Sequence, residues 1–153
     1  MANTTAICTS FKAEVLQALH NLGTTVTRAG TGADTLKAAL IYTTGSIGAG
    51  TTAWASSGIN EVSGTNYSNG GVTVTNATAP TTSGTTAYWT PSAAIVYSTV
   101  TLSTAFDTVL LYNSTQSNRA ILSFNFGSTT VTAGTLTLNM PANAAGTALI
   151  NLA

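Results

Sequence analysis

Apolar and polar side chains alternate along much of this chain, and the alternation predicts β-strands. In the first such segment Leu36, Ala38, Leu40 and Tyr42 fall on one face, whereas Lys37 falls on the other. Successive side chains of a strand point to opposite faces of its sheet, so this spacing predicts a strand with one buried face.

Further short strands are predicted wherever β-branched and apolar residues cluster between turn residues. They lie around Thr52–Trp54, Val62–Tyr67, Val72–Thr75, Thr86–Thr90, Ile95–Leu102, Thr108–Asn113, Arg119–Phe126, Thr129–Thr132, Thr135–Met140 and Ala148–Leu152. The predicted turns between them include SNGG at 68–71, APTTSG at 79–84, NSTQSN at 113–118 and TAG at 132–134. Many short strands with frequent turns predict a mainly β fold, an antiparallel β-sandwich that is jelly-roll-like or a partly closed barrel.

The amino-terminal part has the spacing of a helix instead. Phe11, Val15, Leu19 and Leu22 recur at intervals that place them on one helical face, and Gly23 is suited to end the helix. A threonine and a serine directly before Phe11 can cap its start. A short helix is marginal alone, so this apolar stripe is expected to pack against the sandwich or a partner.

The length of 153 residues suits one domain. Within it we distinguish an amino-terminal helix or arm, residues 1–34, from the β-sandwich, residues 35–153. The one cysteine, Cys8, cannot form an internal disulfide and is interpreted as buried and inert. The sequence has neither a signal peptide pattern nor an apolar run long enough for a membrane span, so we expect synthesis in a cytoplasm and no membrane partner.

Charged residues are scarce, at 5% of the chain, and the four bases balance the four acids. No cluster of lysine and arginine occurs, so a nucleic-acid partner is not expected. A net charge near zero weakens the repulsion between copies, and few lysines protect the strand edges. These features predict a homo-oligomer, for which we expect a trimer.

Residues able to carry catalysis are few and scattered. His20 has no paired carboxylate near it in the predicted helix and is interpreted as solvated or facing the helix end. Cys8 and His20 are too few for a zinc site, and neither Asp34 nor Asp107 has the acidic neighbour of a calcium site. Arg119 is interpreted as a hydrogen-bond donor to carbonyl groups. We therefore predict no enzymatic activity, catalytic residue, metal or cofactor.

Aromatic residues allow two interpretations. A sugar-binding face could use Trp54, Tyr67, Tyr88, Trp89, Tyr97 and Tyr112, but such residues more often fill a core or an oligomer interface, which we favour. The residues that we expect at a partner interface are Phe11, Val15, Leu19, Leu22, Trp54, Tyr67 and Trp89.

Several segments carry a resemblance to a known family. They are TLKAALIY, EVSGTNYSNGGVTV, FDTVLLYNSTQSNRAILSFNFGSTTVTAGTLTLNMP and the closing ALINLA. Together with the predicted helix, they resemble a widespread group of small virion structural proteins of tailed bacteriophages. The resemblance extends over nearly the whole chain. Its most specific parts are EVSGTNY followed two residues later by GG, the turn between LLYNS and NRA, and the step from Phe126 through Gly127 to Ser128.

This resemblance implies a non-enzymatic virion component that is assembled in the host cytoplasm. The expected function is that of a capsid decoration or cement protein, which oligomerises and stabilises the head lattice by binding the major capsid protein or another virion protein. The alternative is a head-fibre, neck or tail component, including an adhesin for host glycans. A tail-associated hydrolase is the least favoured class, because the resemblance supplies no catalytic residues.

Overall fold

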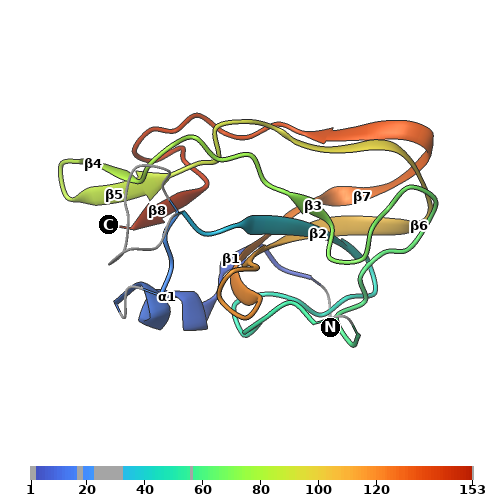
Figure 1. The fold of residues 1–153 in the computed structure, drawn as a ribbon, viewed down its shortest axis with the longest axis horizontal. Helices are drawn as coiled ribbons and strands as arrows, with labels where there is room; N and C mark the ends of the chain where they lie inside the picture. The colour runs from blue at the N-terminus through green and yellow to red at the C-terminus, as the bar shows by residue number, and fades with distance from the viewer. Residues whose placement is uncertain (1–2, 17–18, 23–32, 56, 153) are drawn as a thin grey trace.

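The fold is described from a computed structural model, for residues 3–16, 19–22, 33–55 and 57–152. Two antiparallel sheets and a short helix make up the described chain (Figure 1). The larger sheet has the strand order β1-β7-β6-β2-β3 and the smaller one the order β4-β5-β8. The elements are β1 (Ala6–Ile7), α1 (Thr9–Leu16), β2 (Leu36–Tyr42), β3 (Val72–Thr73), β4 (Thr81–Ser83), β5 (Thr86–Trp89), β6 (Ile95–Asn113), β7 (Arg119–Leu138) and β8 (Ile150–Leu152). The predicted mainly β, sandwich-like fold with an amino-terminal helix is confirmed, and the described strands do not close into a barrel.

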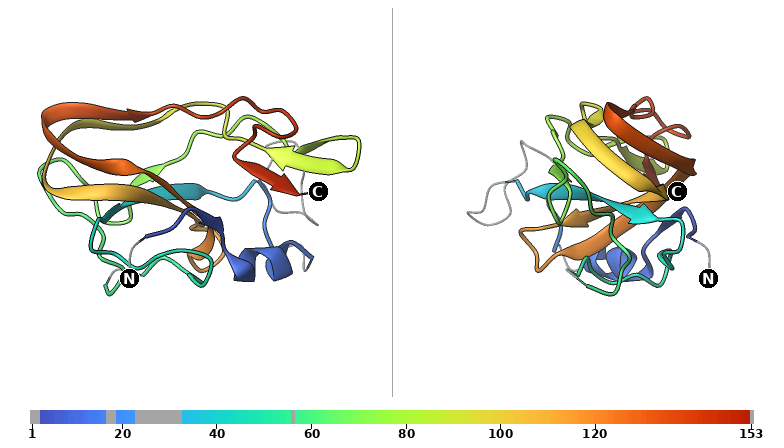
Figure 2. Two further views of the ribbon diagram at one scale, coloured as in Figure 1. Left: turned by 180° about the vertical axis from the view of Figure 1, so that it is seen from behind. Right: turned by 90° about the vertical axis from the view of Figure 1, so that its right-hand side faces the viewer.

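The long strands β6 and β7 pair with each other and supply most of the fold. Their antiparallel ladder runs from Ile95 opposite Leu138 to Asn113 opposite Arg119. The ribbon curls over at one end of the molecule, so its two halves lie one above the other (Figure 2). Register shifts occur along the ladder, and Gly127 has a φ of 91°. Bulges bend a ribbon, so one hairpin contributes to both layers of the sandwich.

This continuity corrects several predicted boundaries. The segments predicted as separate strands around Ile95–Leu102 and Thr108–Asn113 are one strand, β6, and the three predicted strands between residues 119 and 140 are β7. The predicted turn at 132–134 lies inside β7, where Ala133 has a φ of 48°. A residue with positive φ bends a strand locally, and its sequence signal resembles that of a turn.

Three other segments also differ from their predicted state. Residues 52–54 and 62–67 contribute isolated bridges, Ala53 to Arg119 and Thr65 to Thr101, and no ladder of their own. The predicted turn at 79–84 contains β4, which pairs with β5 around Gly84. Short extended segments need a neighbouring strand to become part of a sheet, and the sequence does not show which segments have one.

The centre of the larger sheet is buried on both faces. In β6 every residue from Thr108 to Asn113 is buried, and in β7 so are residues 120–123. The curled half of the ribbon lies over one face, whereas α1 and the chain after β2 lie below the other (Figure 1). Such central strands have nearly continuous apolar sequences, because neither face meets water.

The amino-terminal segment contributes the edge strand β1 to the larger sheet and the helix α1 to the layer below it. β1 pairs with β7, with Ala6 opposite Ser123. The predicted helix is wrong in its length, because α1 ends at Leu16 and Leu22 lies beyond it in non-helical chain. Leu19 N donates to Glu14 O at 3.0 Å, a wider turn that departs from the helical pattern. Gly23, predicted to end the helix, lies outside the described residues. The part of the chain that the structure describes contains no helix long and apolar enough to cross a bilayer.

Candidate functional site

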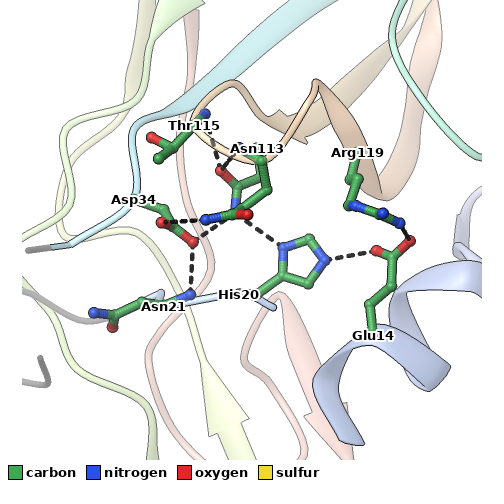
Figure 3. Close-up of polar contacts among 8 residues, drawn as sticks. Glu14, His20, Asn21, Asp34, Asn113, Thr115 and Arg119 are labelled. Atoms are coloured by element: carbon green, nitrogen blue, oxygen red, sulfur yellow. Dashed lines mark hydrogen bonds and ion pairs between the residues drawn. The ribbon is translucent and has the colours of Figure 1, made fainter. Parts of the chain in front are cut away.

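A cluster of polar side chains joins the amino-terminal segment to the turn between β6 and β7 (Figure 3). Glu14 comes from α1, His20 from the chain that follows, and Asp34 from the residues before β2. Asn113 ends β6 and Arg119 begins β7. We call these five residues the His20 cluster.

His20 lies inside the protein and not in solvent, so the predicted solvated position is wrong. Its side chain is 1% exposed, and its ring packs edge-on against Phe11 with 4.8 Å between ring centroids. Its Nε2 lies 2.7 Å from Glu14 Oε2, and its Nδ1 lies 3.1 Å from Asn113 Nδ2. The wide turn after α1 brings His20 back toward Glu14. In a continuous helix the two side chains, six residues apart, would not face each other.

Glu14 also pairs with Arg119, whose Nη1 donates to Glu14 Oε1. The predicted carbonyl contacts of Arg119 are therefore replaced by a carboxylate contact. The Arg119 side chain is 41% exposed and the Glu14 side chain 7%. The guanidinium can thus turn to water, whereas the carboxylate depends on its protein partners.

Asn113 and Asp34 complete the cluster. Asn113 Nδ2 donates to Asp34 Oδ2 at 2.7 Å, and the same oxygen accepts from Asn21 N at 2.8 Å. Asn21 O in turn accepts from Asp34 N at 3.2 Å, so these two residues are joined in both directions. Within the part of the chain that the structure describes, no three His, Cys, Asp or Glu side chains converge to hold a metal ion.

The chemistry of the His20 cluster is that of a joint between segments. A general base needs a nitrogen that can reach a substrate, and both nitrogens of His20 are engaged by protein groups. The cluster nevertheless contains the one histidine of the sequence, a side chain that changes charge near neutral pH.

A second cluster surrounds Glu61 and joins loops to the central sheet. Glu61 Oε1 accepts from Tyr67 Oη at 2.8 Å and from Gly70 N at 2.7 Å, while Oε2 accepts from Trp54 Nε1 at 2.9 Å. Trp54 stacks on Tyr112 with 5.3 Å between ring centroids. We call Glu61 and its three donors the Glu61 cluster.

Burial of the neighbouring tyrosines shifts their acidity. Burial, followed by the charge of Glu61, raises the pKa of Tyr112 to about 12. The same two causes raise the pKa of Tyr67 and of Tyr97, which stack on each other. These rings face one another within the fold, as expected for core residues.

An apolar pocket of about 340 Å³ adjoins the His20 cluster. Strand pairing places Trp89 opposite Ile150 and Ala87 opposite Leu152, so these four side chains share one face of the smaller sheet. Phe11 and other residues of the amino-terminal segment line the opposite wall. The pocket is a gap between two apolar walls.

The residues predicted at a partner interface occupy different environments. Phe11 and Trp89 are each 1% exposed, and Leu22 is 9% exposed, so their side chains stabilise the subunit itself. Leu19, Trp54 and Tyr67 are partly buried. Val15 is 38% exposed at the rim of the apolar pocket.

Cys8 is buried, as predicted, and lies beneath the loop that contains Gly48. Burial, and then the charge of Glu14, raise the pKa of its thiol from 9.0 to about 11. Such a thiol is almost entirely protonated at neutral pH and reacts slowly.

Comparison with protein-family models, curated proteins and solved structures finds no match for this chain. Neither cluster is apparent from the sequence, although the turn after Asn113 and the segment that contains Glu61, Tyr67 and Gly70 are.

Proposed function

We propose that this protein is a non-enzymatic virion structural protein of a tailed phage, a capsid decoration or cement protein that oligomerises and stabilises the head lattice. The proposal combines the resemblance of the sequence with one structural observation. All four acids of the chain, Glu14, Asp34, Glu61 and Asp107, accept hydrogen bonds from the protein's own groups. Their carboxylates hold segments together, as expected of a protein selected for its surface and rigidity.

The outer part of the β6–β7 ribbon supports the same proposal. Residues 95–104 and 128–138 contain no charged side chain. Their exposed positions include Ser98, Thr130, Thr132, Thr135 and Thr137. An uncharged hydroxyl surface repels neither a second copy nor a larger assembly. Weak contacts of this kind gain strength when a symmetric lattice repeats them.

The proposal is tested by comparing virions that contain the protein with virions that lack it. We expect imaging to assign the chain to the head surface, and particles without it to release their genome at a lower temperature. Equal heat resistance would contradict the cement function. Density at the neck or tail, together with lost host attachment, would instead support the head-fibre, neck or tail alternative.

Oligomeric state is a separate part of the proposal. We expect light scattering of the isolated protein at micromolar concentration to give the mass of a trimer. A monomer would contradict the prediction of a trimer in solution. Imaging of virions would then show whether the protein assembles only on the capsid lattice.

A further inference from the structure

The side-chain amide of Asn113 can point in one direction only. Its Oδ1 accepts hydrogen bonds from the backbone N–H groups of Thr115 and Gln116, at 3.1 and 3.2 Å. If the amide were turned over, its N–H groups would face these donors and its oxygen would face the Asp34 carboxylate. The Nδ2 group therefore faces Asp34 and His20, with one hydrogen for each (Figure 3).

This orientation fixes the form of the imidazole. Because Asn113 Nδ2 is a donor, His20 Nδ1 must accept the hydrogen bond at 3.1 Å. An uncharged imidazole that accepts at Nδ1 carries its hydrogen on Nε2. That N–H donates to Glu14 Oε2 at 2.7 Å. The turn after β6 thus holds His20 in its neutral Nε2–H form.

We propose that the His20 cluster is a proton-sensitive latch between the amino-terminal segment and the turn that joins β6 to β7. A second proton on His20 occupies Nδ1 and points at the N–H group of Asn113, so two donors oppose each other. The bond to Glu14 remains, because Nε2 donates in both forms. Protonation therefore separates His20 from Asn113 and keeps His20 joined to α1.

Charged and titratable groups surround His20. Among the described residues, Glu14 faces His20 directly, Arg119 neutralises Glu14, and Asp34 lies on the far side of the Asn113 amide. The Cys8 thiol is close enough to Glu14 for its acidity to respond to that charge. Acidification, which adds a second proton to a neutral imidazole, is the trigger.

The chain has one histidine, so its ring signals in nuclear magnetic resonance report the latch without ambiguity. At about pH 7.5 we expect the ¹⁵N shifts of the neutral Nε2–H form. On acidification, the ring signals of His20 should report a second proton. The resonances of the Asn113 side-chain amide should change over the same pH range. Hydrogen-exchange protection of Asn21 N, which is bonded to Asp34, should fall by about tenfold over the same pH range.

Two variants control this measurement. Glu14 and Asn113 can keep their contacts with the amide of His20→Gln, which does not titrate, so protection of Asn21 N should stay constant in that variant. Asn113→Asp replaces the donor that faces Nδ1 by an acceptor, so a proton on Nδ1 no longer meets an opposing donor, and acidification should leave His20 joined to the turn. If Asn113→Asp does not fold, the tautomer and exchange of the wild type remain decisive.

Three results would overturn the latch. The first is an Nδ1–H tautomer, or a doubly protonated ring, in the wild type at about pH 7.5. The second is a loss of Asn21 protection on acidification that is equal in the wild type and in His20→Gln. The third is a titration of His20 that leaves the Asn113 amide and Asn21 protection unchanged.

Discussion

The Glu61 cluster and the His20 cluster both use a carboxylate to join loops to the central sheet, but their donors differ. Glu61 binds an indole, a phenol and a backbone amide, which keep their hydrogens across the physiological pH range. Glu14 binds an imidazole and a guanidinium that is 41% exposed. The donors of the first joint therefore keep their hydrogens, whereas the second joint includes a guanidinium that water can compete for and an imidazole that, in our proposal, releases Asn113 when it gains a second proton. The donors that a carboxylate binds therefore decide whether it acts as a fixed or a conditional contact.

Backbone geometry makes the Glu61 cluster more rigid still. Gly70 donates to Glu61, and Gly71 follows it with a φ of 71° directly against β2. A Cβ atom at Gly71 would lie 1.7 Å from Ala38 O. The turn can approach the strand this closely only because the residue there lacks a side chain.

The largest expected effect comes from Gly71→Ala. The clash with a backbone oxygen and the positive φ together should cost at least about 4 kcal/mol of unfolding free energy, or prevent folding. The control is Gly127→Ala, because Gly127 has a φ of 91° and its added Cβ would have no atom within 4 Å. Strain alone should cost about 1 kcal/mol there. Urea denaturation measures both, and equal losses would show that the turn yields without disturbing β2.

Much of the Glu61 turn could be predicted, but its contacts could not. The two glycines of the SNGG segment predict a turn, and the alternation of Leu36–Tyr42 predicts β2. That Glu61 accepts from Tyr67 and Gly70 depends on how the loop folds back on itself. A single carboxylate in a polar loop gives no sequence signal of this kind, because most such residues are exposed.

The His20 cluster escaped prediction for a different reason. Phe11, Val15, Leu19 and Leu22 have a helical period, which predicts a helix that carries His20 away from Glu14. Tertiary contacts overrule this pattern, since α1 ends at Leu16 and the chain turns back. A helix of eight residues gains most of its stability from packing, so its end is set by the surrounding structure and not by its own sequence.

Replacing each carboxylate by its amide sharpens the comparison of the two joints. In Glu61→Gln one oxygen that now accepts a hydrogen bond becomes a donor, and a fixed donor is left opposite it. We expect a loss of about 2 to 3 kcal/mol. In Glu14→Gln the new donor can face Arg119, which turns to water, and we expect a loss of about 1 kcal/mol. Thermal or urea unfolding at neutral pH compares them, and a larger loss for Glu14→Gln would reverse the proposed ranking.

A further prediction concerns Cys8, whose thiol responds to the charge of Glu14. A buried thiol whose pKa is raised from 9.0 to about 11 stabilises the fold fully below the lower value. That contribution is lost as pH rises, because the unfolded chain releases the proton first. The free energy of unfolding of the wild type should therefore fall relative to that of Cys8→Ser between about pH 9 and 11. Tyrosines and lysines titrate in both proteins, so the difference isolates the thiol.

The two carboxylate variants then separate the causes of the Cys8 shift. Burial is its larger cause and the charge of Glu14 its smaller one. In Glu14→Gln the thiol pKa should fall but remain above 9.0, whereas Glu61→Gln should leave it unchanged. The ultraviolet absorbance of the thiolate during an alkaline titration, with Cys8→Ser as the blank, gives both values. An equal shift in the two variants would mean that altered packing, and not the charge of Glu14, controls the pKa of this thiol. It would contradict the expectation that Cys8 responds to the carboxylate of one joint and not to that of the other.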